Sequence, residues 1–189
     1  DPQSEAEREG RTLLLTLPLK PIELGLVNVY TPNAGAELSR LPYRTGAGGW
    51  DERFRAALVG PQLFGDHLCV LGDLNVAVED LDFFNPHEAR MKKQAGTTPE
   101  ERASMREMLA PAGGMVDGFR HVHANADGQF TYWSQRARNR PRNRGLRIDY
   151  ALVSAGLVAS GALVDVQHLQ HLEGSDHCPV VMTLRLDRL

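Results

Sequence analysis

The side chains that could do chemistry lie in three short segments, each at the end of a predicted strand. Asp73 and Asn75 follow an apolar run, and their two-residue spacing can place both side chains on one face of the chain. Asp149 stands at the start of a later strand, and Asp176 and His177 are neighbours directly before the last one. These positions supply three carboxylates, one amide and one imidazole.

These groups are the ones that metal-assisted phosphodiester hydrolysis needs. A hard cation such as Mg²⁺ binds carboxylate oxygens and neutralises charge that grows on phosphate oxygens, and an imidazole held by a carboxylate can act as a base or stabilise the transition state. Each segment alone has an ordinary explanation, because Gly-Asp-x-Asn is a common turn and Ser-Asp-His is a short tripeptide. Their order and their flanks together favour a hydrolytic site.

An arginine-rich segment lies between two of these groups. The net charge of the chain is −3, so contact with phosphate must come from a local patch. The intervening Pro141 and Gly145 predict a loop, which follows Tyr132 and Trp133 and fits contact with a DNA backbone. A solvated arginine loop is the alternative. Arg40 is a weaker phosphate-binding candidate, and the arginines of the loop are Arg136, Arg138, Arg140, Arg142, Arg144 and Arg147.

The elements that must position these groups alternate between strands and helices. We expect a hairpin from strands near residues 13–17 and 22–30, and a loop over residues 31–49. Thr98, Pro99 and Glu101 form a capping-box sequence that starts a helix. This pattern favours antiparallel pairing over a doubly wound parallel sheet, with sheet packed on sheet and helices outside. A further helix is expected from about residue 51, and further strands at residues 67–71, 130–133, 148–153, 164–169 and 179–186.

Composition narrows the class of protein. The 189 residues fit one domain, and 42% of them are hydrophobic, as in globular proteins. Cys69 and Cys178 have no disulfide framework around them, which favours a reducing compartment. No apolar stretch approaches the roughly 18 residues of a membrane span, so we expect no membrane partner. Residues 1–10 are polar and read as a linker-like start, and His121, His123, His168 and His171 as surface or strand-edge residues.

Several segments in a fixed order resemble the exodeoxyribonuclease III branch of the endonuclease/exonuclease/phosphatase superfamily, which contains the abasic-site (AP) endonucleases. The resemblance extends from about Gly10 to Leu186. It is carried by Val27-Asn28-Val29-Tyr30-Thr31-Pro32-Asn33, Leu71-Gly72-Asp73-Leu74-Asn75, Asn85-Pro86, Ala95-Gly96-Thr97-Thr98-Pro99-Glu100-Glu101-Arg102, Phe130-Thr131-Tyr132-Trp133, Gly145-Leu146-Arg147-Ile148-Asp149-Tyr150 and Gly174-Ser175-Asp176-His177-Cys178-Pro179.

The resemblance implies a function and a cofactor. It implies a DNA repair endonuclease that hydrolyses the phosphodiester 5′ to an abasic site, with 3′-phosphodiesterase or 3′→5′ exonuclease activity as additional reactions. Mg²⁺ is the expected cofactor, with Mn²⁺ as an alternative, and DNA containing abasic sites is the expected partner. The location implied is the nucleus in a eukaryote and the cytoplasm otherwise. A superfamily phosphatase is the less favoured activity, because the arginine loop and residues 95–102 are typical of the nucleases.

The resemblance also assigns residues to roles. Asp149 would hold the imidazole of His177 against the scissile phosphate, and Asp73 would lie beside the attacking water or the leaving group. The implied catalytic residues are Tyr30, Asp73, Asn75, Asp149 and His177. The implied metal ligands are Asp73, Asn75, Asp176 and His177. The expected substrate-binding residues are Asn33, Arg40, Asn85, Tyr132, Trp133, Arg136 and Leu146, of which Tyr132, Trp133 and Leu146 would line the pocket for a flipped-out abasic sugar.

One departure from the family pattern concerns the first half of the domain. The family takes an Asn from a Trp-Asn motif and a Glu from a Gln-Glu motif, and neither motif occurs here, since Trp50 and Trp133 precede Asp51 and Ser134. The implied fold is therefore α/β (α+β), a four-layered sandwich of the DNase I-like type of which residues 1–189 form the second half. We expect the first half as a partner and little activity from this chain alone. A non-catalytic nucleic-acid-binding or scaffold module is the alternative.

Overall fold

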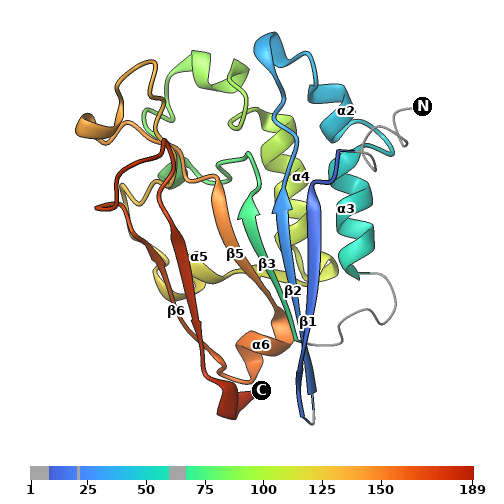
Figure 1. The fold of residues 1–189 in the computed structure, drawn as a ribbon. Coiled ribbons are helices and arrows are strands. Elements are labelled where there is room, and N and C mark those ends of the chain that lie inside the picture. Colours follow the sequence, from blue (N-terminus) through green and yellow to red (C-terminus); the bar gives the residue numbers. More distant parts are fainter. Residues whose placement is uncertain (1–8, 21, 60–66) are drawn as a thin grey trace.

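The computed structural model describes residues 9–20, 22–59 and 67–189 as a mixed α/β fold (Figure 1). The expected linker over residues 1–10 falls largely outside the described residues. Among the described residues, no helix is long and apolar enough to cross a membrane. The strands are β1 Thr12–Leu19, β2 Ile22–Tyr30, β3 Leu68–Asp73, β4 Met115–Asp117, β5 Asp149–Ser154, β6 Leu163–His168 and β7 Val180–Leu184, and the α-helices are α2 Leu41–Thr45, α3 Trp50–Val59, α4 Pro99–Leu109, α5 Gly118–Val122 and α6 Ala155–Ala159.

Five strands form the main sheet in the order β1-β2-β3-β5-β4. The predicted hairpin is confirmed, since β1 and β2 pair antiparallel. Only β2 and β3 pair parallel, while β5 is antiparallel to both β3 and β4. In this register Tyr30 is the partner of Asp73, and Asp73 is the partner of Asp149. Three predicted site residues therefore lie side by side at one end of the sheet.

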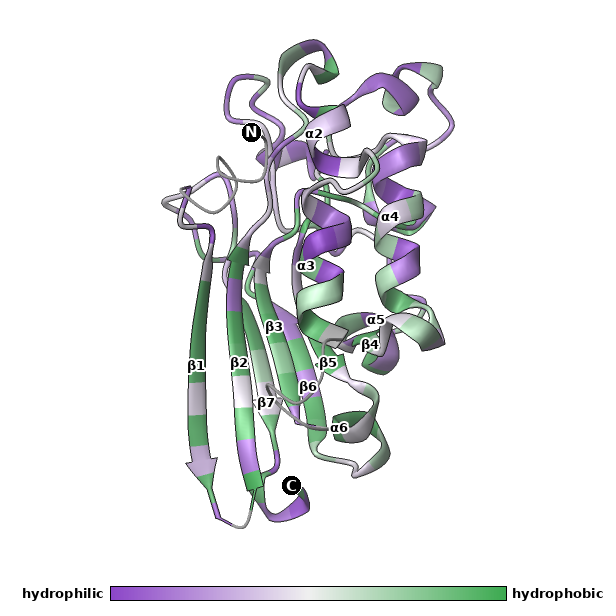
Figure 2. Ribbon diagram, turned by 90° about the vertical axis from the view of Figure 1, so that its right-hand side faces the viewer, coloured by the Kyte–Doolittle hydropathy of each residue, from purple (hydrophilic) through white to green (hydrophobic). Residues whose placement is uncertain are grey.

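One face of the sheet packs against α3 and α4. Alternate residues of the central strands point to opposite faces, so Val70 and Leu152 turn toward the helices and are fully buried. Trp50 and Phe54 of α3 stack with their ring centroids 4.8 Å apart in the same cluster. Met105 and Met108 of α4 belong to it as well. Figure 2 shows both helices on the same side of the strands.

The other face packs partly against a second, two-stranded sheet formed by β6 and β7. Cys69 and Val153 turn toward this layer and are fully buried, and Met182 of β7 packs against the same cluster. The β6–β7 ribbon does not cover β1, whose Leu13 and Leu15 are 72% and 54% exposed. Figure 2 shows β1 as a largely hydrophobic strand at the edge of the sheet. The sheet-on-sheet arrangement is confirmed, but one edge of it is open in this chain.

The structure differs from the sequence expectations in several elements. Residues 130–133 do not form a strand, because Tyr132 bridges singly to Leu146 and to His177 and no neighbouring strand continues alongside. The expected loop over residues 31–49 contains α2, and β4, α5 and α6 were not predicted. These missed elements have three to five residues, which is too short for a periodic pattern.

Candidate active site

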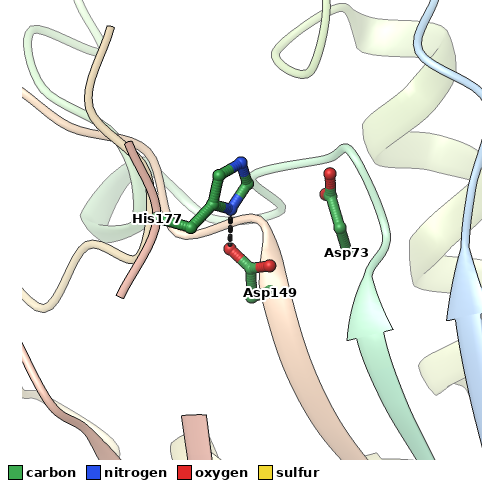
Figure 3. A group of neighbouring side chains, drawn as sticks. All are labelled: Asp73, Asp149 and His177. Atoms are coloured by element: carbon green, nitrogen blue, oxygen red, sulfur yellow. Dashed lines mark hydrogen bonds and ion pairs between the residues drawn. The ribbon is translucent and has the colours of Figure 1, made fainter. Parts of the chain in front are cut away.

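Asp73, Asp149 and His177 meet where β3 ends and β5 begins (Figure 3). The two carboxylates come from adjacent strands, and the imidazole comes from the loop before β7. His177 Nδ1 lies 2.7 Å from Asp149 Oδ2. One ligand atom from each of the three residues lies within 4.8 Å of the other two, so the group could hold a metal ion. Asp149, expected to orient the imidazole, is thus also within reach of a cation, whereas Asp176 is not part of this group.

The turn after β3 depends on a glycine and on a left-handed asparagine. Gly72 has φ of +136°, and a Cβ at this position would lie 2.0 Å from the carbonyl oxygen of Val29. Only glycine therefore allows β2 to approach this closely. Asn75 has φ of 49°, a conformation that asparagine tolerates better than most residues. Its backbone N–H donates to Asp73 Oδ1 at 2.8 Å, which fixes the carboxylate over the turn.

The amide of Asn75 is held by two further hydrogen bonds. Its Nδ2 donates to the Thr31 carbonyl oxygen at 2.8 Å, and its Oδ1 accepts from Asn33 Nδ2 at 2.9 Å. Asn33 Oδ1 in turn accepts from the N–H of Gly35 at 2.8 Å. These bonds set the orientation of both amides and leave each Oδ1 with further accepting capacity toward the pocket.

Burial and mutual charge perturb the titration of this group. Burial, and then the charge of Asp149, raise the pKa of Asp73 to about 7. Burial alone would lower the pKa of His177, but its hydrogen bond to Asp149 and the charges of Asp149, Asp73 and Asp176 outweigh burial and raise it. The imidazole therefore favours its protonated form beside the carboxylates. A cluster this rich in negative charge calls for a cation before a phosphate group can approach.

An open pocket of about 780 Å³ covers these residues. One part of its wall is apolar, made by Phe84, Met91, Leu146 and Ile148. Another part carries arginine side chains, which suits an anionic ligand. These are Arg90, Arg142 and Arg144.

Most of the predicted site residues come together in this pocket. Asp149 lies behind the wall with its carboxylate on His177, and the Tyr132 ring centroid is 5.0 Å from that of the imidazole. Burial and the charge of Asp176 raise the pKa of the Tyr132 phenol, so it stays neutral. The predicted residues that line the pocket are Tyr30, Asn33, Asp73, Asn75, Tyr132, Leu146, Asp176 and His177.

Four expected substrate-binding residues are not among those that line the pocket. Trp133 is buried against Phe130 and Cys178, and its Nε1 donates to Asn143 Oδ1 at 3.0 Å. Side chains alternate along an extended segment, so Tyr132 faces the pocket while Trp133 faces the core. The others are Arg40, which pairs with Glu9 and covers the Tyr43 ring, Asn85, which donates to Glu88, and the exposed Arg136.

The arginine loop divides into inward and outward side chains. Arg147 is buried and pairs with Asp82 at 2.8 Å and with Asp117 at 2.7 Å, so it does not belong to a DNA-facing patch as expected. Arg140 also turns inward and donates to the Ser175 carbonyl oxygen at 2.6 Å, where it supports the loop that carries His177. Arg136 and Arg138 are exposed.

Sequence reasoning missed several residues of the pocket wall. Phe84, Arg90, Met91 and Gln94 lie in irregular and 3₁₀ segments between η2 Asp80–Asp82 and α4. No periodic pattern marks such a segment, although the pair Phe83-Phe84 before Asn85-Pro86 is an apolar signal within a polar stretch. His168 lies on the edge strand β6, as expected, but it is partly buried and its ring stacks on Phe119 with centroids 4.1 Å apart.

Comparison with known proteins identifies the family. A model of the endonuclease/exonuclease/phosphatase family matches residues 8–177. The chain belongs to this family. The motifs noted in the sequence fall within or directly beside this range, so the predicted family and the DNase I-like fold are confirmed.

Comparison with curated relatives shows which members of the family this chain is similar to. The DNA repair nuclease APEX1 of Danio rerio is 36% identical over 182 residues, which cover 96% of this chain and 54% of that protein. The exodeoxyribonuclease of Bacillus subtilis is 36% identical over 185 residues, covering 96% of this chain and 67% of the relative. The chain therefore spans between half and two thirds of the length of these relatives.

Solved structures agree with the sequence relatives. The AP endonuclease LMAP from Leishmania major has a TM-score of 0.82 and 36% identity, covering 93% of this chain and 55% of that one. The catalytic domain of APE2 from Xenopus laevis has a TM-score of 0.74 and 29% identity, covering 97% of this chain and 59% of that one. Nearly all of this fold is thus similar to part of each larger domain.

Proposed function

We propose that this chain forms the C-terminal part of the catalytic domain of a DNA repair endonuclease, which hydrolyses the phosphodiester 5′ to an abasic site. The observation that carries the proposal is the group of Asp73, Asp149 and His177 beneath a pocket with a basic rim. Relatives named as repair nucleases and AP endonucleases support the substrate class. In this reaction a water oxygen bonds to phosphorus and the bond to the 3′ oxygen breaks, which leaves a 3′-hydroxyl and a 5′-phosphate.

The residues at the end of the sheet have different proposed roles, which follow from the chemistry of their side chains. His177, oriented by its contact with Asp149, is placed to donate to a phosphate oxygen on which charge grows in the transition state. The Asp73 carboxylate lies at the same pocket, where it is placed to take a proton from the attacking water. Asn75 and Asn33 orient the phosphate with the amide groups that line the pocket, and Tyr30 lies beside them.

The donor set fits a hard divalent cation, and we propose Mg²⁺, with Mn²⁺ as a substitute. Carboxylate and amide oxygens from Asp73, Asn75 and Asp176 line the same pocket, and such oxygens are the ligands that Mg²⁺ prefers. When bound there, the cation supplies positive charge to the phosphate oxygens. It would also offset the repulsion between Asp149 and Asp73, which together with the larger effect of burial raises the pKa of Asp73.

The walls of the pocket support DNA as the substrate. Arg90, Arg142 and Arg144 line the pocket and offer positive charge to backbone phosphates. Leu146 and Ile148 form an apolar part of the wall of the same pocket. An uncharged sugar without its base, turned out of the helix, would pack against such a wall.

We also propose that a segment corresponding to the first half of the domain covers the open face of the sheet. Leu13 and Leu15 lie on the same face of β1 as Leu17, which packs against the core beneath β6–β7. Large apolar side chains exposed side by side are usually covered by another layer. The relatives contain nearly as many residues again as the part that this chain matches. This segment is the expected source of the remaining metal ligands.

The test uses the complete protein and a duplex with one abasic-site analogue. We expect a single nick 5′ to the analogue in Mg²⁺, none in EDTA, and none in a matched duplex without the lesion. Because the catalytic groups act mainly on the transition state, Asp73→Asn should lower turnover by about two orders of magnitude, or about 3 kcal/mol, with little change in DNA affinity. Nicking that persists in EDTA would contradict the metal-dependent proposal.

A further inference from the structure

A buried arginine outside the pocket holds the turn that carries two of the proposed catalytic residues. Arg44 of α2 is 2% exposed and is not among the residues that line the pocket. Its Nη2 donates to the carbonyl oxygen of Leu74 at 2.6 Å, and its Nη1 donates to that of Asn75 at 2.7 Å. One planar group therefore fixes two successive peptide carbonyls directly after Asp73.

Two buried carboxylates hold the same guanidinium. Its Nε donates to the two carboxylate oxygens of Asp51 at 3.2 and 3.3 Å, and its Nη1 donates to Glu101 Oε1 at 3.0 Å. Asp51 belongs to α3 and Glu101 to the first turn of α4. The helices α2, α3 and α4 therefore each contribute one charged side chain to a single cluster.

Glu101 extends the cluster to the wall of the pocket. Its Oε2 accepts from the backbone N–H of Gly96 and from Thr98 Oγ1, both at 2.8 Å. Ala95 and Gly96 line the pocket, and the Gly96 carbonyl accepts from the N–H of Ala77 at 2.7 Å. The cluster thus connects the catalytic turn with the adjoining segment of the pocket wall.

Stability alone explains this cluster poorly. Burying three charges costs several kcal/mol per ion in desolvation, and apolar residues of similar volume often replace such clusters without loss. The carbonyls that Arg44 holds flank Asn75, whose left-handed φ of 49° persists only if its surroundings fix it. Hydrogen bonds from a charged donor are the strong ones, and two of them converge at this point.

We propose that Arg44, held between Asp51 and Glu101, is a positioning residue that fixes the Asp73–Asn75 turn and the Ala95–Gly96 wall in the geometry the reaction requires. This inference rests on the proposed nuclease function. Arg44 acts through the backbone and touches no substrate. A small displacement of the turn would move the Asp73 carboxylate and the Asn75 amide together, which lowers turnover more than it lowers DNA binding.

The conservative variant Arg44→Lys tests whether the planar shape of the guanidinium is required or its positive charge is sufficient. Lysine keeps the positive charge but has no planar fork, so it cannot serve two carbonyls and two carboxylates at once. In the complete protein we expect kcat on abasic duplex to fall about tenfold to a hundredfold, the range typical of residues that orient metal or catalytic groups. KM should stay within about threefold of the wild-type value, because the DNA-facing side chains are unchanged.

The matched control lies on the same helices. Arg55 and Glu107 form an ion pair between α3 and α4 at 2.6 Å, away from the pocket. Arg55→Lys should leave kcat within about twofold of wild type. Glu101→Gln is the second variant, because the amide oxygen of glutamine can keep the capping-box contacts while its NH₂ group replaces the charged oxygen that accepts from Arg44. We expect it to lower kcat at least about threefold, with KM unchanged.

The outcomes separate the two proposals. A wild-type protein that does not nick abasic DNA contradicts the proposed function itself. A wild-type protein that nicks, with Arg44→Lys turning over at the wild-type rate, overturns the positioning role alone. If Arg44→Lys does not fold, Glu101→Gln decides: an unchanged kcat overturns the proposal, and a lowered kcat at unchanged KM supports it.

Discussion

Asp149 and His177 are 28 positions apart in the sequence and 2.7 Å apart in the structure. The carboxylate does two things for the imidazole: it fixes the ring through Nδ1 and favours the protonated form. Because that hydrogen bond raises the pKa of His177 against the effect of burial, its removal must lower the pKa. The pair therefore gives a direct prediction at the scale of single residues.

We expect Asp149→Asn to lower the pKa of His177, and to lower turnover at least about tenfold. NMR titration of the imidazole measures the first effect and single-turnover cleavage the second. The matched control is Asp165→Asn, because Asp165 makes the same 2.7 Å contact with His123 at a site away from the pocket. A His177 pKa that does not move in Asp149→Asn would contradict the assigned role of the carboxylate.

The lowered pKa of His168 predicts how this residue makes the stability of the protein depend on pH. Burial lowers its pKa to about 4, and its Nδ1 lies 3.1 Å from the carbonyl oxygen of Gln129, to which it donates in the neutral form. The unfolded imidazole takes up a proton below about 6.5 and the folded one only near 4, so stability falls as the pH falls through this window. By itself, His168 should contribute a loss of about 2 kcal/mol from pH 7 to pH 5, whereas the raised pKa of Asp73 gives a contribution of the opposite sign over the same range.

Urea unfolding of the complete protein and of His168→Gln at the two pH values isolates this contribution. His168→Gln should be less stable at pH 7, because it gives up the contact with Phe119, but its change in stability on going to pH 5 should be about 2 kcal/mol more favourable than that of the wild type. An equal pH dependence in the two proteins would assign the effect to other groups.

The capping box shows which elements can be predicted from local sequence. Thr98 Oγ1 accepts from the N–H of Glu101 as predicted, since every group involved lies within four residues. The same holds for the β1–β2 hairpin, which local alternation and turn residues specify. Residues 130–133 have the composition of a strand, but their backbone partners come from residues 146 and 177. Local composition carries no information about where such partners lie.

The sequence predicted correctly that the arginine loop is a positively charged loop. It did not predict which of the arginine side chains turn inward and which are exposed. Arg140 donates to the carbonyl oxygens of Ser175, Gln170 and Leu172 and lies 4.6 Å from the Trp133 ring. Arg138, two positions earlier, is exposed. Sequence alone cannot separate these two side chains, because the difference depends on a loop more than 30 residues away.

This division predicts two different phenotypes. Replacing Arg136 and Arg138 with Ala should weaken DNA binding and make the slope of log K against log[salt] shallower by up to about 2. Each phosphate contact releases counterions when it forms, so a variant with fewer contacts releases fewer of them. Arg140→Ala should change that slope little and lower turnover instead, since it loosens the loop that carries His177. Binding measured from 50 to 300 mM salt, with kcat measured in parallel, tests both. If all the variants showed the same salt slope as the wild type, the loop would not contact DNA phosphates.

At the scale of the whole molecule, the sheet has one well-covered face and one face that is covered in part. On the first face, α3 and α4 bury the central strands but leave Leu14 of β1 51% exposed, and on the other face the β6–β7 ribbon leaves Leu13 and Leu15 exposed. The motifs of the sequence predicted the family and the sheet end that carries the acidic group. The exposure of Leu13, Leu14 and Leu15 in β1 could not be predicted, because these leucines match a buried strand in every local respect.

We expect residues 1–189 alone to associate through this face. Size-exclusion chromatography over a range of concentrations should show association that Leu13→Glu and Leu15→Glu reduce. Leu81→Glu is the control, because Leu81 is 40% exposed but lies in η2. In the complete protein, the backbone amides of β1 should be protected from hydrogen exchange. A monodisperse monomer of residues 1–189 at high concentration would contradict the covered-face proposal.

The central claim is that the acidic group at the sheet end directs water onto a phosphodiester 5′ to an abasic site. Cleavage of an abasic duplex by the complete protein in ¹⁸O-labelled water, with mass spectrometry of both product ends, tests it most directly. Hydrolysis at this bond predicts a 3′-hydroxyl on one fragment and one ¹⁸O atom in the 5′-phosphate of the other, with both products absent for His177→Ala. An unsaturated sugar end with no ¹⁸O in the phosphate would instead indicate elimination on the 3′ side and would contradict the account.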